Sequence, residues 1–201
     1  MSSLAPSVGP PGASGWRTRD VVVTAVLGAA FGVLFWAWGN LAWPALGFLG
    51  PLQNLFYGPW LIPAVLAPLV IRRPGSGVFA EVVAASVSAV LGSQWGVIVL
   101  LYGVAQGLAG ELPFLATRYR VFTWPVAVAA GILASLAAWL LDWAFYFSEV
   151  AVATQLVVGA LMAVSGVVVV AGGSLFLARA LRDAGVLDGA AGAEGREGSP
   201  T

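Results

Sequence analysis

The 201-residue chain contains no cysteine, no histidine and no lysine. Without cysteine or histidine it has no disulfide, no cysteine nucleophile, no histidine base and none of the usual zinc ligand sets. The Gly-x-x-x-x-Gly-Lys-Ser/Thr motif that binds nucleotide phosphates is also absent. Charged residues make up only 9% of the chain and the formal net charge is zero, so no basic surface exists to hold nucleic acid. We therefore expect no enzymatic activity, no catalytic cofactor, no metal site and no nucleic-acid partner.

Hydrophobic residues, in contrast, make up 60% of the chain, and the mean hydropathy is +0.93. A membrane-crossing helix needs about 20 predominantly apolar residues. Six apolar segments approach that length, near residues 21–39, 54–71, 77–92, 96–116, 123–141 and 151–178. The sequence predicts an all-α integral membrane protein, a bundle of six transmembrane helices over residues 16–183. The low-complexity ends, 1–15 and 184–201, are expected to be disordered.

The arginines predict how the chain crosses the lipid bilayer. Short loops rich in arginine stay on the cytoplasmic side of a membrane. One assignment satisfies every arginine: both termini are cytoplasmic, and three hairpins close on the outer side. On this assignment the basic residues that mark the cytoplasmic side are Arg17, Arg19, Arg72, Arg73, Arg118, Arg120, Arg179, Arg182 and Arg196.

Aromatic residues favour the outer half of this predicted bundle. Those that map to the outer half or the outer loops are Trp36, Trp38, Trp43, Trp60, Trp95, Trp139 and Trp143, whereas only Trp16 and Trp124 mark the inner face. An interfacial belt populates both faces. The asymmetry indicates either a one-sided belt with internal packing or an aromatic cavity open to the outside. Tyr57, Tyr102 and Tyr146 fall on the same side and favour the cavity.

Acidic residues add a charge to that outer side. Trp139, Asp142, Tyr146 and Glu149 are spaced three, four and three apart, which forms one stripe if the helix continues through them. An aromatic face beside a carboxylate suits a flat organic cation, through cation–π attraction and a counter-charge. The alternative is that these acids only face water.

Two further carboxylates, Glu81 and Glu111, fall inside predicted spans. A carboxylate within the membrane is costly and is a functional candidate by default, although each could instead neutralise an arginine from the boundary. Tyr102 and Gln106 share a helix face. Glu111 lies about 140° around from Gln106 on an ideal helix, so the two line one pocket only if the helix is distorted.

Two local patterns bear on helix packing. Three prolines in the second span, Pro59, Pro63 and Pro68, predict a kinked or locally opened helix, which needs protein or a cavity to cover the freed carbonyls. In the first span, Ala25-x-x-x-Ala29 and the adjacent Gly-x-x-x-Gly allow another helix to approach closely. This spacing serves either internal packing or a partner protein.

Four segments of the six-span pattern match a known family: Ala25-x-x-x-Ala29, Tyr57-Gly58-Pro59-Trp60, Ile71-Arg72-Arg73-Pro74-Gly75 followed by Glu81, and Gly103-x-x-Gln106-Gly107-x-x-x-Glu111. With these segments the chain resembles the substrate-binding S components of energy-coupling factor (ECF) vitamin transporters, and most of all their YkoE group. The resemblance covers roughly residues 16–183.

The resemblance implies a protein of the prokaryotic plasma membrane that captures thiamine or its hydroxymethylpyrimidine precursor (HMP) from outside. It implies delivery by a transmembrane coupling protein, which Ala25 and Ala29 would face, and two ABC ATPases. One pyrimidine site would serve either ligand. The residues expected to contact ligand are Glu111, Gln106, Tyr102, Trp60, Tyr57, Asn54, Trp95, Trp139, Asp142, Tyr146 and Glu81.

Two other functions stay open from the sequence. A self-sufficient secondary transporter of a small organic cation would use the buried carboxylates as proton or ion sites. A membrane assembly protein would use only its small-residue helix faces and would bind no ligand.

Overall fold

The computed structural model describes residues 15–185 and shows a bundle of helices throughout. The predicted end segments, 1–15 and 184–201, lie outside the described residues apart from Gly15, Ala184 and Gly185. In chain order the elements are α1 (Thr18–Ala37), the π-helical turn η1 (Trp38–Ala42), α2 (Trp43–Ala45), the 3-10 segments η2 (Gly47–Phe56) and η3 (Gly58–Leu61), α3 (Ile62–Ile71), α4 (Ser76–Val90), the 3-10 turn η4 (Gly96–Ile98), α5 (Val99–Ala116), α6 (Trp124–Phe145), α7 (Val152–Ser165), the π-helical segment η5 (Gly166–Gly172) and α8 (Gly173–Asp183).

These elements form six apolar segments, as the sequence predicts. Five are long and apolar enough to cross a membrane: Thr18–Ala45, Gly47–Ile71, Gly96–Ala116, Trp124–Phe145 and Val152–Asp183. The sixth, α4, is a shorter apolar helix. The protein is therefore an all-helical membrane protein with six membrane segments.

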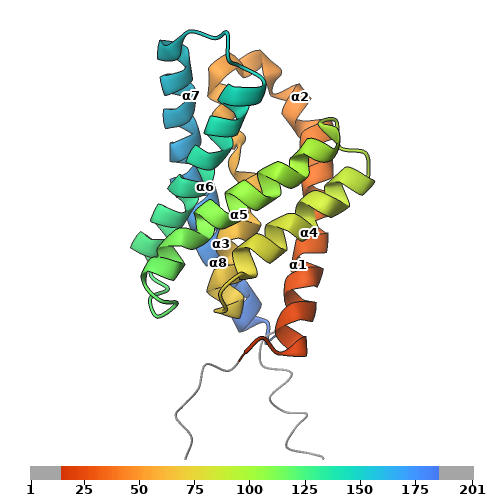
Figure 1. The fold of residues 1–201 in the computed structure, drawn as a ribbon, viewed down its shortest axis with the longest axis vertical. Helices are drawn as coiled ribbons and strands as arrows, with labels where there is room; N and C mark the ends of the chain where they lie inside the picture. The colour runs from red at the N-terminus through yellow and green to blue at the C-terminus, as the bar shows by residue number, and fades with distance from the viewer. Residues whose placement is uncertain (1–14, 186–201) are drawn as a thin grey trace, which may run out of the picture.

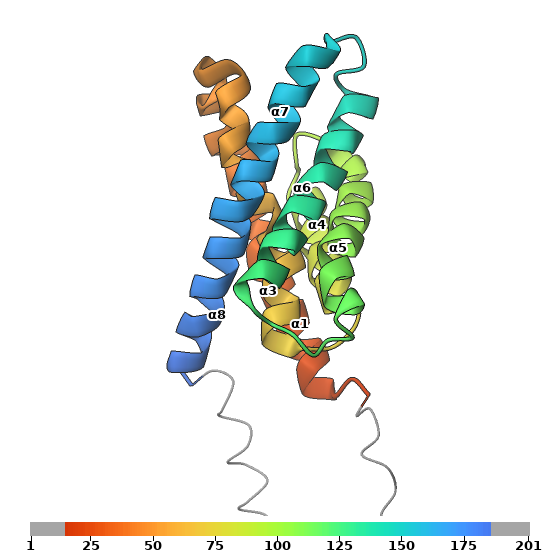
Figure 2. The same cartoon turned by 90° about the vertical axis from the view of Figure 1, so that its left-hand side faces the viewer.

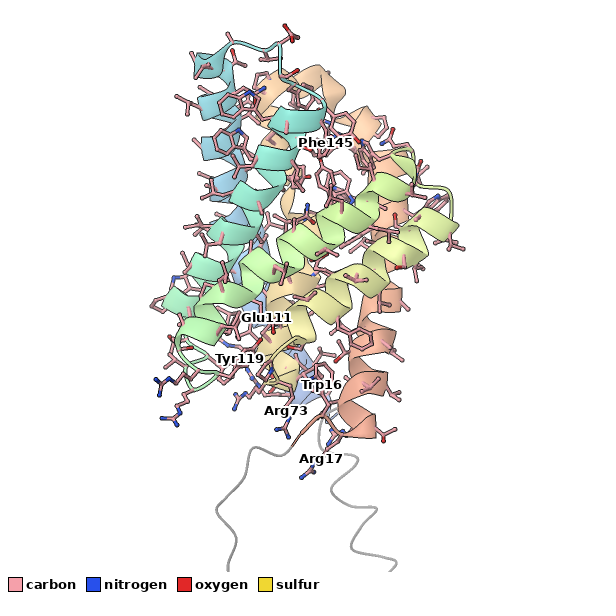
Figure 3. The ribbon with its side chains drawn as sticks, viewed as in Figure 1. Trp16, Arg17, Arg73, Glu111, Tyr119 and Phe145 are labelled. Carbon is pink, nitrogen blue, oxygen red and sulfur yellow. The ribbon has the colours of Figure 1, made fainter. Side chains whose placement is uncertain are left out.

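One end of the bundle collects the arginines. Helix α1 begins and α8 ends at this end (Figures 1 and 2). The α3–α4 and α5–α6 turns lie there as well, and Arg17 and Arg73 are labelled there in Figure 3. We call it the arginine end. Its described arginines are Arg17, Arg19, Arg72, Arg73, Arg118, Arg120, Arg179 and Arg182.

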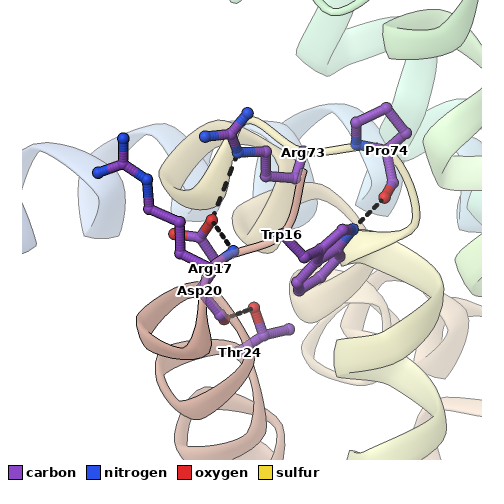
Figure 4. Close-up of polar contacts among 6 residues, drawn as sticks. All are labelled: Trp16, Arg17, Asp20, Thr24, Arg73 and Pro74. Carbon is purple, nitrogen blue, oxygen red and sulfur yellow. Dashed lines mark hydrogen bonds and ion pairs between the residues drawn. The ribbon is translucent and has the colours of Figure 1, made fainter. Parts of the chain in front are cut away.

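Polar contacts tie the start of α1 to the α3–α4 turn at the arginine end (Figure 4). The Nε atom of Arg73 lies 3.4 Å from Oδ2 of Asp20. The Arg17 backbone N–H donates to the same oxygen, over 3.1 Å. The Trp16 indole N–H donates to the Pro74 carbonyl, over 3.0 Å. The N-terminal part of α1 is thus fixed against the turn that precedes α4.

Helix α3 is the centre of the bundle. It contacts α1, α4, α5, α6 and α8, and every residue from Ile62 to Leu69 is buried. Its sequence (IPAVLAPLVI) is apolar on all sides, which is typical of a helix with no solvent- or lipid-facing stripe. The other segments surround it.

The proline-rich second span departs from a regular helix, as predicted. Only Ile62–Ile71 is α-helical, because the chain from Gly47 to Leu61 forms 3-10 turns. Gly50 (φ 55°, ψ −133°) breaks the first of them. Two side chains accept hydrogen bonds from buried backbone N–H groups of this span. The Gly58 N–H donates to Oγ of Ser165 over 2.9 Å, and the Ala64 N–H donates to Oε1 of Glu81 over 2.9 Å.

Small residues of α1 pack against α4. A Cβ at Gly28 or Gly32 would lie 2.8 or 2.5 Å from the Cβ of Val83 or Val87. The Gly-x-x-x-Gly spacing therefore serves internal packing. Ala25 and Ala29 are half-buried.

Candidate ligand-binding site

A cavity of about 620 Å³ lies in the half of the bundle away from the arginine end. Segments η2, η3, α4, α5 and α7 contribute to its wall, together with the end of α6 and the loop after it. All but two of the predicted ligand contacts line it. These lining residues are Asn54, Tyr57, Trp60, Glu81, Trp95, Tyr102, Gln106, Asp142 and Tyr146.

Four aromatic side chains, Trp43, Tyr57, Trp60 and Trp95, form one side of the cavity, which we call the aromatic wall. The rings meet edge to face, with centroids 4.8 Å apart for Trp43 and Trp60 and 5.3 Å apart for Trp60 and Trp95. Tyr57 lies 5.1 Å from Trp60. Such contacts favour fixed ring positions, so the wall presents a rigid apolar surface to a flat ligand.

Gly39, in the π-helical turn η1, lies against the Trp95 ring of the aromatic wall. A Cβ at Gly39 would lie 2.5 Å from Cζ3 of Trp95 and 3.5 Å from Cζ2 of Trp60. Next to Trp95, the Gln94 side-chain amide donates to the Gly39 carbonyl. The absence of a side chain at Gly39 therefore gives Trp95 its space.

Asp142 carries a carboxylate at the end of α6. Its Oδ1 accepts a hydrogen bond from the Tyr102 hydroxyl over 2.7 Å. Tyr57 and Gln106 line the same cavity. Partial burial, and then the charge of Asp142, raise the pKa of the Tyr146 hydroxyl above its ordinary value. The predicted stripe ends there, since α6 stops at Phe145 and Glu149 is exposed.

Glu81 is fully buried and also lines the cavity. Its Oε1 accepts the Ala64 N–H in the first turn of α3, an end of a helix that favours negative charge. Its Oε2 is buried without a hydrogen-bond partner among the described residues. A buried polar atom without a partner is costly, and a ligand donor in the cavity would satisfy it.

The structure does not bring Glu111 to the cavity. Glu111 lies near the arginine end beside Tyr119 (Figure 3), because α5 stays helical and turns it away from Gln106. Its carboxylate accepts the Gly75 N–H, the Val78 N–H (3.3 Å) and the Tyr119 hydroxyl. Burial, and then the hydrogen bond to Glu111, raise the pKa of the Tyr119 hydroxyl. The hydroxyl therefore keeps its proton and donates to Glu111. Glu111 thus joins the α3–α4 turn to the α5–α6 turn.

Trp139 does not line the cavity either. Its indole N–H donates to the Gln155 carbonyl over 2.9 Å, and its ring packs on Gly159 of α7. The Gln155 side chain in turn donates to the Phe147 carbonyl over 2.8 Å. Trp139 therefore supports the α6–α7 loop, and this packing takes its ring out of the cavity.

Other lining residues were not predicted from the sequence, among them Trp43, Gln53, Phe147 and Gln155. Gln155 could have been predicted as a lining residue, because it is an amide within an apolar span, as Gln106 is. Trp43 was assigned to the outer half only. Gln53 and Phe147 lie in irregular segments, where spacing gives no direction for a side chain.

We predict that Gly39→Ala lowers the free energy of unfolding by about 1–3 kcal/mol, because the added methyl overpacks Trp95. Thermal unfolding of the purified protein in detergent measures this. Gly47→Ala is the matched control, since no atom lies within 4 Å of a Cβ at Gly47. In a Trp95→Phe background the cost of Gly39→Ala should shrink. An equal cost in both backgrounds would contradict the assigned contact.

We predict that Glu111→Gln lowers the free energy of unfolding by about 1–3 kcal/mol, since an amide cannot accept all three hydrogen bonds. The same substitution at the exposed Glu149 should change stability little. Ligand affinity should stay unchanged in Glu111→Gln, because the residue lies outside the cavity. A selective loss of affinity with unchanged thermal unfolding would restore Glu111 as a ligand contact.

Three comparisons identify the family. Residues 19–137 match a family model described as "ABC-type cobalt transport system, permease component". The chain is 34% identical, over 128 residues or 63% of its length, to a Bacillus subtilis (strain 168) protein provisionally named HMP/thiamine permease protein YkoE. This match spans 64% of that protein, which is less than two thirds of it. The chain is also similar to a crystal structure of an S-component of an ECF transporter, at 31% identity and a TM-score of 0.80, covering 91% of this chain and 94% of that one. The chain therefore belongs to the S components of ECF transporters, which are non-enzymatic membrane subunits.

Proposed function

We propose that this S component binds thiamine or HMP in the cavity and delivers it across the membrane with a coupling protein and two ABC ATPases. One observation carries the proposal: a single cavity combines a rigid aromatic wall with two carboxylates, Glu81 and Asp142. The name of the YkoE relative supports the choice of ligand.

The chemistry of the cavity suits each part of thiamine. The aminopyrimidine ring, which HMP shares, would stack on the aromatic wall and donate to the free Oε2 of Glu81. The thiazolium ring is a cation, and Asp142 beside Tyr102 offers the counter-charge. A volume of about 620 Å³ falls within the range typical of small-molecule sites.

An organic ligand suits this site better than the cobalt ion in the name of the matching family model. No group of three or more His, Cys, Asp or Glu side chains that could hold a metal ion occurs in the part of the chain that the structure describes. Transition metals select such ligands. The cavity offers aromatic rings and separated carboxylates instead.

The arginines support an orientation with the arginine end in the cytoplasm of a prokaryotic cell. The cavity then lies in the outer half of the bundle, where ligand arrives. On α1, the half-buried Ala25 and Ala29 are proposed to contact the coupling protein, because small residues let a helix approach closely.

The deciding experiment is a titration of the purified protein with thiamine and with HMP, followed through quenching of its own tryptophan fluorescence. We expect saturable, sub-micromolar binding. A bound ligand should quench the fluorescence, because three tryptophans stand in the aromatic wall. A folded protein that binds neither compound would refute the proposed ligand. Uptake by liposomes that contain this chain alone would favour the ion-coupled transporter instead.

We predict that Asp142→Asn weakens thiamine binding at least about tenfold and leaves HMP binding nearly unchanged, because only thiamine carries a permanent charge. Glu81→Gln should weaken both ligands, since both carry the aminopyrimidine. Glu149→Gln is the control, with an exposed carboxylate three residues after Tyr146. Equal losses of both ligands in Asp142→Asn would contradict this assignment.

A further inference from the structure

We infer that the cavity rejects phosphate esters of its ligand, so that the molecule carried is unphosphorylated and either neutral or cationic. This rests on the proposed function, because it specifies which chemical form the same site accepts. Thiamine and HMP each carry a hydroxyl that can bear a phosphate. The charges around the cavity decide whether such an ester can bind.

The cavity lining holds acids and no base. Among the residues that line it, the charged side chains are Glu81 and Asp142, and no arginine contributes. The chain contains no lysine and no histidine that could supply a positive charge. A phosphate ester carries a charge of about −1.5 to −2 at neutral pH, and no cationic side chain of the lining would compensate it.

None of the described arginines lines the cavity. They stand at the turns and helix ends of the arginine end. Arg73 lies in the turn before α4, and Glu81 lies in the second turn of that helix. Arg73 pairs with Asp20, and Arg72 lies over the Phe122 ring, 4.7 Å from its centroid. These contacts hold both side chains at the arginine end.

Several neutral donors of the lining are already engaged within the protein. A phosphate binds well where amides or hydroxyls point free donors at it. Three lining amides already donate to backbone carbonyls: Gln53 to Trp43 (2.6 Å), Asn54 to Pro51 (3.0 Å) and Gln155 to Phe147 (2.8 Å). The Tyr102 hydroxyl donates to Asp142. One N–H of each of these amides and the Tyr102 hydroxyl are therefore engaged before a phosphate enters.

No orientation of the ligand avoids this conflict. Asp142 lies at the end of α6 and Glu81 within α4, so the two carboxylates come from separate parts of the lining. A phosphate on the thiazolium side would meet Asp142. A phosphate on the pyrimidine side would meet Glu81, where no lining arginine compensates its charge. Like charges at short range in a partly desolvated site repel strongly.

Isothermal titration of the full chain in lipid nanodiscs tests the inference. The ligands are thiamine, thiamine monophosphate and acetylthiamine, whose ester adds bulk to the same hydroxyl without charge. We expect the monophosphate to bind weaker than thiamine by a factor on the order of 100, and acetylthiamine to bind much closer to thiamine. In Asp142→Asn the ratio between thiamine and its monophosphate should fall, whereas in Glu149→Gln it should not change.

The outcomes separate the two proposals. If the folded protein binds no unphosphorylated ligand, the proposed function fails. If thiamine binds and the monophosphate binds within about threefold of it, the proposed function stands and the exclusion of phosphate esters is overturned. Equal rejection of acetylthiamine and the monophosphate would also overturn it, because size and not charge would then set the preference.

Discussion

The hydrogen bond from the Ala64 N–H to Glu81 links the fold of this protein to its candidate site. A membrane segment cannot leave backbone donors unpaired, and the proline-rich second span has no regular helix before Ile62 to pair them. Glu81 from α4 and Ser165 from α7 supply the partners. The same two bonds hold α4 and α7 against the central segment, and the cavity lies among these elements. One oxygen of Glu81 thus stabilises the start of α3, while the other has no hydrogen-bond partner among the described residues.

The two buried glutamates show how hydrogen-bond partners separate structure from binding. Glu81 and Glu111 are both nearly inaccessible, so both incur the cost of a desolvated carboxylate. Glu111 offsets that cost within the protein, through two backbone N–H groups and the Tyr119 hydroxyl. Glu81 does so with only one of its oxygens. The fully paired carboxylate of Glu111 joins helices, whereas the half-paired one of Glu81 lines the cavity where we propose that ligand binds.

Charge is divided between the two halves of the bundle. Arginines gather at one end, where Asp20 and Glu111 fix the turns that carry some of them. Carboxylates and aromatic rings line the cavity in the other half. In the proposed orientation this division serves two purposes, because the arginines would set the topology and none of the described ones lines the cavity. The preference for a cationic or neutral ligand would then follow from how the chain crosses the membrane.

The sequence by itself determined the helical class, the six segments, the end that collects arginines and the half that holds Trp60, Tyr102 and Asp142. These follow from hydropathy and from position along a helix, which are local properties. It also showed that Gln106 and Glu111 face different ways on a straight helix. Only the tertiary structure decided that Glu111 lies outside the cavity, that Trp139 supports a loop, and that Trp43 and Gln155 line the site. Those outcomes depend on which segments pack together and which donors each side chain meets there. The spacing of residues within one segment does not contain that information.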